Sequence, residues 1–279
     1  MGGNKARKAE FLMADVLRKG SDVILTAGPI QSNHARTIAA AARKISKECH
    51  LFLAGEKPDP PTGNVLLDVL ADAQIHVVRT EQERQPAMEA FAIQLRKEGR
   101  NPYVIPVGGS NEIGSQGYVS GFEELEMQLR NLPSKPTVLV FCSSSGGTHA
   151  GILVGKAMTD SKVEILGIRN DDEPIFAETI CSVANALSKK IGLSREFHTE
   201  QVRLNSDYVG EGYGVPSKAG VAAFKELWQC EGILLDHVYT AKAMAGLIDL
   251  ARRGNWLDDR VVFLHTGGIP SVFSSPSPH

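Results

Sequence analysis

The sequence carries three loops of small and hydroxyl-bearing residues, each after a predicted strand. They lie within TAGPIQSNHAR, FCSSSGGTHAG and LHTGGIP. Ligands of open parallel sheets bind beyond the carboxyl ends of the strands, so we expect the three loops to converge on a ligand. In the second loop, SSSGGT precedes an apolar helix and offers hydroxyls, unhindered backbone N–H groups and a helix N-terminus, all suited to a phosphate. An ordinary helix cap with glycines for the turn explains the same residues equally well.

The spacing of the glycines restricts the kind of phosphate. Neither the G-x-x-x-x-G-K-[ST] pattern of a nucleotide loop nor the G-x-G-x-x-G pattern of a dinucleotide site is present, so a small cofactor with one phosphate fits better. The chain begins MGGNKARKAEF, which sets Lys5 among small residues. A lysine taken alone is far more often solvent-facing than catalytic. Together with a phosphate site it suggests pyridoxal phosphate, because the aldehyde of this cofactor needs an amine and its phosphate needs donors.

The elements that must position these residues alternate along the chain. Apolar runs predict strands at 22–28, 49–55, 75–80, 102–109, 137–145, 163–169 and 260–268. Segments of helical period lie at 33–45, 64–73, 81–99, 121–130, 149–158, 175–193, 218–230 and 241–253. Strands that are buried on both faces and joined by helices form parallel sheets, so the predicted class is α/β.

Composition excludes several classes of partner. Hydrophobic residues make up 42% of the chain, charged residues 22%, and the net charge is -2, which argues against nucleic acid or an anionic membrane as partners. The cysteines Cys49, Cys142, Cys181 and Cys230 are scattered, so we expect reduced, buried thiols and no metal site. Without a signal-type or membrane-length apolar run, we expect a cytoplasmic protein.

Seven motifs, in order, resemble one enzyme family. They are GGNKARKAEFL, LTAGPIQSNHAR, YVIPVGGSN, SSSGGTHAG, GYGVP, EGILLDHVYTAKAM and LHTGGIP, and they extend from Gly2 to about Pro270. The chain resembles the D-cysteine desulfhydrase and aminocyclopropane-carboxylate (ACC) deaminase family of pyridoxal phosphate enzymes. The resemblance implies fold type II, similar to tryptophan synthase β: two three-layer α/β/α domains with mainly parallel sheets, in a homodimer. It places a small domain at 10–118 and a large cofactor-binding domain at 1–9 and 119–279. Family members carry a segment before GGNK, so we expect an N-terminally shortened fold here.

The resemblance also assigns roles to residues. Lys5 corresponds to the lysine that binds the cofactor's aldehyde covalently, Lys8 approaches the phosphate, and Asn33 donates to the phenolic oxygen. Ser32 lies on the substrate side, although it could equally be a helix cap. The residues assigned to the phosphate are Ser145, Gly146, Gly147 and Thr148.

Aromatic and histidine side chains complete the predicted site. Tyr239 resembles the tyrosine that stacks on the cofactor ring, and Tyr213 the one that faces the substrate. His34 is assigned to the substrate side as well, although a histidine at such a position is more often satisfied within the core. Lys242 could be mistaken for the covalently bound lysine, but we expect it to lie in the following helix.

Two positions distinguish the members of the family. Deaminases carry glutamate directly after the stacking tyrosine and leucine before the last GG, where this chain has Thr240 and Thr266. A carboxylate would hold a proton on the pyridine nitrogen, whereas a threonine would not. We therefore expect Thr266 to contact the ring nitrogen and Thr240 to lie behind it. The predicted activity is β-elimination from D-cysteine, with Lys5, Ser32 or Tyr239 as the base that takes the α-proton.

Three other functions compete with this one. The first is ACC deaminase, which Thr240 and Thr266 oppose. The second is a chain with impaired or no catalysis, motivated by the expected shortening. The third is a nicotinamide oxidoreductase, for which the fingerprint glycines are not found.

Overall fold

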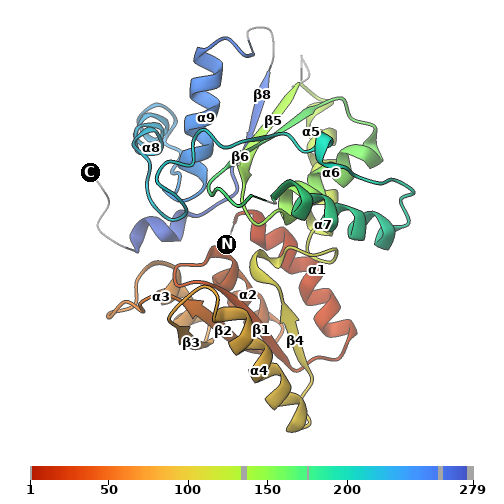
Figure 1. Ribbon diagram of the computed structural model, residues 1–279, viewed down its shortest axis with the longest axis vertical. Helices are drawn as coiled ribbons and strands as arrows, with labels where there is room; N and C mark the ends of the chain where they lie inside the picture. The colour runs from red at the N-terminus through yellow and green to blue at the C-terminus, as the bar shows by residue number, and fades with distance from the viewer. Residues whose placement is uncertain (1, 133–136, 175, 257–259, 275–279) are drawn as a thin grey trace. The chain divides into compact units, whose positions relative to one another are not determined.

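The fold was analysed in a computed structural model that describes residues 2–132, 137–174, 176–256 and 260–274. The described chain divides into two compact units (Figure 1). Unit 1 comprises residues up to Gly114 together with the segment from Pro270, and unit 2 runs from Ser115 to Ile269. Each unit contains one sheet with helices on both faces, as predicted from the alternation of strands and helices.

Unit 1 is built on a four-stranded sheet of order β3-β2-β1-β4, in which all pairings are parallel. Its strands are β1 (Val23–Pro29), β2 (Glu48–Ala54), β3 (Gln74–Val78) and β4 (Pro102–Ile105). Its helices are α1 (Asn4–Arg18), α2 (Asn33–Lys44), α3 (Gly63–Leu70), α4 (Arg84–Lys97) and the short 3-10 helix η1 (Val107–Gly109). Alternate side chains of the strands face α1 and α2 on one side and α4 on the other, which gives three layers.

Helix α1 was not predicted, yet it positions two of the candidate residues. Its apolar side chains Ala9, Leu12, Met13 and Val16 recur at helical spacing and are buried in the core of unit 1, where α1 packs against α2. Full burial of a side chain such as Leu12 contributes about 1.5–3 kcal/mol, so this stripe holds the helix on the sheet.

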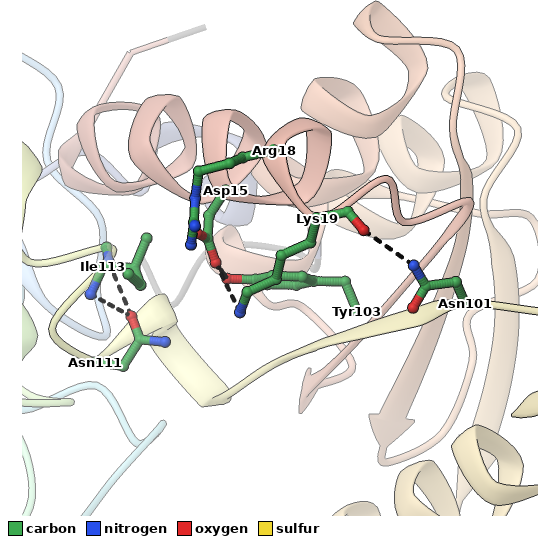
Figure 2. A network of polar contacts seen from close by, with 8 residues as sticks. Asp15, Arg18, Lys19, Asn101, Tyr103, Asn111 and Ile113 are labelled. Carbon is green, nitrogen blue, oxygen red and sulfur yellow. Dashed lines mark hydrogen bonds and ion pairs between the residues drawn. The ribbon is translucent and has the colours of Figure 1, made fainter.

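A polar network fixes the far end of α1. The buried carboxylate of Asp15 accepts a 2.6 Å hydrogen bond from the hydroxyl of Tyr103 in β4 and pairs with Arg18 and Lys19 (Figure 2). Burial alone would raise the pKa of Asp15, but these three donors outweigh it and hold the pKa below its ordinary value. The network ties α1 to β4, the strand that leads into η1.

Unit 2 repeats the architecture with a four-stranded sheet of order β7-β6-β5-β8, again with parallel pairings. Its strands are β5 (Val138–Ser143), β6 (Glu164–Arg169), β7 (Leu204–Asn205) and β8 (Val261–Leu264). Its helices are α5 (Gln116–Leu129), α6 (Gly147–Thr159), α7 (Phe176–Ile191), α8 (Lys218–Glu231) and α9 (Thr240–Arg252), with short 3-10 helices η2 (Thr199–Gln201) and η3 (Ile269–Phe273), the last entering unit 1. The core against α5, α6 and α7 lies on one face of the sheet, and α9 covers the other.

The compact units and the predicted domains have different limits, and the predicted domains stay a prediction. The prediction placed 1–9 with 119–279 and gave 10–118 to the small domain. In the structure α1 is one continuous helix, and its buried apolar side chains belong to the core of unit 1. The first segment of unit 1 ends at Gly114, and unit 2 begins at Ser115. Strand β7, which is two residues long, was also not predicted because its apolar run is too short to register.

The structure tests two expectations from composition, namely the burial of the cysteines and the lack of a membrane-length apolar run. Three thiols are buried as expected, but Cys230 is exposed near the end of α8, so the expectation of burial is wrong for that residue. Within the described ranges, every helix is too short or too polar to cross a bilayer.

Candidate active site

Two lysine side chains of α1 meet at one backbone carbonyl of unit 1. Nζ of Lys8 donates to the carbonyl oxygen of Gly108 at 3.0 Å and to Oγ of Ser110 at 3.1 Å. Nζ of Lys5 donates to the same carbonyl at 3.4 Å. The two residues are three apart on a helix and therefore share a face. The structure thus brings together the two amines that the sequence assigns to the aldehyde and the phosphate.

Lys8 lies in an unusual environment for a cation. Only 1% of its surface is exposed, and no carboxylate of the described residues pairs with it. Burial, and then the nearby charge of Lys5, hold the pKa of Lys8 well below its ordinary value. A buried amine beside a second amine is favourable only when an anion joins it or one amine is neutral. This corner of unit 1 is therefore suited to an anion and to a nucleophilic amine.

The turn between β1 and α2 positions Ser32 and Asn33. Oγ of Ser32 accepts the backbone N–H of Ala35 at 3.1 Å, so Ser32 is the N-cap of α2. A Cβ at Gly28 would lie 2.5 Å from this Oγ, which explains the glycine at the end of β1. Asn33 begins the helix, and its Oδ1 accepts from Nδ2 of Asn64 in α3 at 2.9 Å.

His34 is held within the core of unit 1. Its Nε2 lies 2.8 Å from Oγ1 of Thr26, and that hydroxyl donates to the carbonyl of Ile105 at 3.0 Å. Because the hydroxyl proton is committed to the carbonyl, Nε2 of His34 carries the proton and donates to Thr26. Burial, with smaller effects of Lys5 and Lys8, holds the pKa of His34 well below its ordinary value, so the ring is neutral. These contacts suit a core histidine, and its assignment to the substrate stays a prediction.

The glycine loop of unit 2 leads directly into α6. Gly146 caps the helix with φ 78°, a left-handed conformation that favours glycine, and a Cβ there would lie 3.3 Å from Cγ1 of Ile180. Thr148 is buried in the first turn of this 13-residue helix. The loop therefore places Gly146, Gly147 and Thr148 at a helix N-terminus, where an anion is favoured.

Two tyrosines meet at another part of unit 2. The hydroxyls of Tyr213 and Tyr239 are 2.6 Å apart, and the rings lie edge to face with centroids 6.1 Å apart. Burial, followed by the proximity of Tyr213, raises the pKa of Tyr239 well above its ordinary value. Tyr239 therefore keeps its proton at neutral pH. The structure brings together the two tyrosines predicted to face the ring and the substrate.

Sequence reasoning missed the residue that holds the loop of Tyr213. Lys242 in α9 is fully buried, and its Nζ donates to the carbonyls of Val209 and Gly212, each at 2.7 Å. As expected, it lies in the helix after Tyr239. Its amine therefore binds the backbone directly before Tyr213 and stabilises this loop.

The threonines that distinguish the family members have different surroundings. The hydroxyl of Thr240 donates to Oδ1 of Asp236 and accepts the backbone N–H of Asp236, each at 2.7 Å. Its proton is therefore committed to the fully buried Asp236 and is not available to a ring nitrogen. Thr266 is buried two residues before Gly268, where a Cβ would lie 2.4 Å from Cγ of Asp236. The expected roles of Thr240 behind the ring and of Thr266 at the ring nitrogen both stay predictions.

The residues present fit pyridoxal phosphate. Unit 1 contains the buried amine of Lys8, which has no carboxylate partner in the described chain, beside the partly buried amine of Lys5, and an asparagine at the start of α2. Unit 2 contains a glycine-capped helix N-terminus and a partly buried, protonated tyrosine. No group of histidine, cysteine or carboxylate side chains able to hold a metal ion is found among the described residues.

Comparison with known proteins gives the class. A family model described as pyridoxal-phosphate dependent enzyme matches residues 1–267. The chain therefore belongs to the pyridoxal-phosphate dependent enzymes, as the motifs predicted. The cofactor of this family is pyridoxal phosphate.

Relatives narrow the class to one group. The chain is 40% identical over 283 aligned residues to D-cysteine desulfhydrase of Salmonella choleraesuis (strain SC-B67). This alignment covers 98% of this chain and 84% of the relative. A crystal structure of an ACC deaminase homologue matches with a TM-score of 0.89 at 34% identity, over 98% of this chain and 82% of that one. A pyridoxal 5'-phosphate-dependent aspartate racemase, with a TM-score of 0.66 at 16% identity over 96% and 80% of the two chains, shares the fold alone. The predicted resemblance and the type II fold are confirmed.

Proposed function

We propose that this protein is a D-cysteine desulfhydrase, which converts D-cysteine and water to pyruvate, hydrogen sulfide and ammonia. The observation that carries the proposal is the 40% identity to D-cysteine desulfhydrase over 98% of the chain. Thr240 and Thr266, in place of the deaminase glutamate and leucine, support the same choice. A thiolate is already a good leaving group at neutral pH, so the reaction does not need a carboxylate at the ring nitrogen.

When bound, pyridoxal phosphate withdraws electrons from the α-carbon of the amino acid, which makes its proton removable. The amine of Lys5, which shares the carbonyl of Gly108 with the buried amine of Lys8, is proposed to bind the cofactor's aldehyde. Lys8 and the loop of Ser145, Gly146, Gly147 and Thr148 are proposed to hold the phosphate. Asn33 would donate to the phenolic oxygen, and Tyr239 would pack against the ring.

The substrate-side groups act on protons and orientation. Ser32, whose hydroxyl already caps α2, is proposed to lie near the substrate carboxylate and the reacting carbon. Tyr213 is proposed to face the substrate, supported in its position by its hydrogen bond to Tyr239. Lys5, released from the cofactor, is proposed as the base that removes the α-proton. A homodimer and a cytoplasmic location remain predictions.

ACC deaminase is the second candidate, favoured by the match to the ACC deaminase homologue. The two are separated by measuring sulfide and pyruvate from D-cysteine and 2-oxobutanoate from ACC with the same purified enzyme. We expect kcat/KM for D-cysteine to exceed that for ACC by about 100-fold or more. A preference for ACC would assign the deaminase activity instead, and turnover of neither substrate would reject both.

A further inference from the structure

Two buried side chains stand behind Asn33 in unit 1. Arg36 lies one turn further along α2 and Asn64 lies in the first turn of α3, with 3% and 0% of their surfaces exposed. Nε of Arg36 donates to Oδ1 of Asn64 at 3.2 Å, and Nδ2 of Asn64 donates to Oδ1 of Asn33 at 2.9 Å. The three side chains form a chain of hydrogen bonds that ends at the predicted cofactor ligand.

The direction of these hydrogen bonds is fixed at two points. A guanidinium has only donors, so the atom of Asn64 that faces Arg36 must be the amide oxygen. The other end of the same amide lies 2.9 Å from the carbonyl oxygen of Gln31, which only accepts. Both neighbours require the same orientation of the Asn64 amide, and neither can adapt to the opposite one.

The orientation of Asn64 then determines that of Asn33. Because Nδ2 of Asn64 is a donor, the Asn33 atom facing it must be the oxygen, and the NH₂ group of Asn33 turns away from Asn64. The described residues offer no acceptor for that NH₂ group within hydrogen-bond distance. We propose that Arg36 and Asn64 are positioning residues that orient Asn33 so that it presents a donor to the phenolic oxygen of the cofactor. This inference rests on the proposed role of Asn33.

The chemistry of the ligand makes the orientation consequential. A phenolic oxygen that carries negative charge accepts a hydrogen bond from an amide NH₂, whereas an amide oxygen in the same place repels it. Reversing the Asn33 amide would therefore replace an attraction by a repulsion without changing the size of any side chain.

Asn64 has a second role, which determines the choice of variant. Its backbone N–H donates to Oε1 of Gln31 at 2.7 Å and helps to hold the turn before α2. A truncation would keep this backbone hydrogen bond but would remove the acceptor for Arg36 and both donors of the side chain at once. Asn64→Asp keeps the size, the backbone N–H and an acceptor for Arg36, but replaces the donor to Asn33 and to the carbonyl of Gln31 by a carboxylate oxygen, and the Asn33→Leu background separates these two losses. Asn33 would then rotate to donate to that carboxylate.

The experiment is a double-mutant cycle on cofactor binding by apoprotein, with pyridoxal phosphate as the titrant. We expect Asn64→Asp to weaken binding by about 10- to 100-fold, the range for a hydrogen bond to a charged group, and to shift the visible absorbance of the bound cofactor. Asn33→Leu removes the group through which Asn64 acts. In that background Asn64→Asp is expected to cause no further loss.

Asn185→Asp is the matched control, because the Asn185 side chain of unit 2, like that of Asn64, both accepts and donates. Its Oδ1 accepts the backbone N–H of Phe197 at 2.7 Å, and its Nδ2 donates to the carbonyl of Phe197 at 3.0 Å. This variant is expected to leave binding unchanged. Unaltered binding by Asn64→Asp, or an equal loss with and without Asn33, overturns the inference. Failure of the unmodified apoprotein to bind the cofactor at all would instead reject the proposed function, and the inference with it.

Discussion

The choice of the proton-removing base depends on single residues. Three groups compete for this role, namely Lys5, Ser32 and Tyr239. The hydroxyl of Tyr239 bonds to that of Tyr213 and has a pKa well above its ordinary value, caused first by burial. The hydroxyl of Ser32 is engaged with the N–H of Ala35. A base must be able to lose its proton near neutral pH, so these contacts favour Lys5.

Tyr239→Phe tests this assignment because it keeps the ring and removes only the hydroxyl. We expect kcat for sulfide release from D-cysteine to fall by less than about tenfold, whereas loss of a general base costs about 100-fold or more. Tyr213→Phe, which removes the same hydrogen bond from the other side, is the control and should show a similar small effect. A loss of about 1,000-fold in Tyr239→Phe alone would identify Tyr239 as the base.

Between elements, α2 and α3 are joined by buried polar groups. Asp68 follows Asn64 by one turn of α3, is fully buried, and is near enough to Arg36 for their charges to interact. Neither carboxyl oxygen has a hydrogen-bond partner among the described residues. Burial raises the pKa of Asp68 to about 8, although Arg36 opposes the shift. Asp68 is therefore mostly protonated at neutral pH.

This raised pKa predicts how stability depends on pH. The folded state holds a proton on Asp68 that the unfolded state releases near its ordinary pKa of about 4, so stability falls as the pH rises between about 4 and 8. Asp68→Asn removes this dependence with little change in size. We expect the variant to match the parent at about pH 4 and to be more stable by a few kcal/mol at about pH 8, since each pKa unit corresponds to about 1.4 kcal/mol.

Urea unfolding across this pH range measures the difference. Asp72→Asn is the control, because Asp72 follows the same helix but is 77% exposed, and this variant should keep the parent's fall in stability between about pH 4 and pH 8. If Asp68→Asn is less stable than the parent at about pH 8, the carboxylate is ionised and paired with Arg36, and the account of this helix pair is wrong.

For the whole molecule, the sequence predicted the sheets and most of the helices because their apolar runs are strong. The strands at 22–28 and 163–169 were predicted within one residue of β1 and β6. Helix α1 was not predicted, although Ala9, Leu12, Met13 and Val16 carry a helical stripe, because the two glycines before Lys5 have low helix propensity. The period of those residues was the available signal.

The candidate site was predictable where motifs carry it and not where it depends on tertiary contacts. Lys5 and Lys8 both donate to the carbonyl of Gly108, which lies about a hundred positions further along the chain. No local sequence pattern predicts such a contact. The roles of Asn64 and Lys242 likewise depend on partners in other elements, and an asparagine or lysine in a helix usually faces solvent. The motifs therefore indicated the residues that are predicted to contact the cofactor. They did not indicate Asn64 and Lys242, which contact those residues or their loops.

The central claim is that Lys5 binds the aldehyde of pyridoxal phosphate. The most direct measurement is reduction of the cofactor-loaded protein with borohydride, followed by mass spectrometry of its peptides. The account predicts the cofactor's mass on Lys5 and on neither Lys8 nor Lys242, and no modification in Lys5→Ala. Modification of Lys8 or Lys242 in the parent protein, or none in a folded and loaded protein, would contradict it.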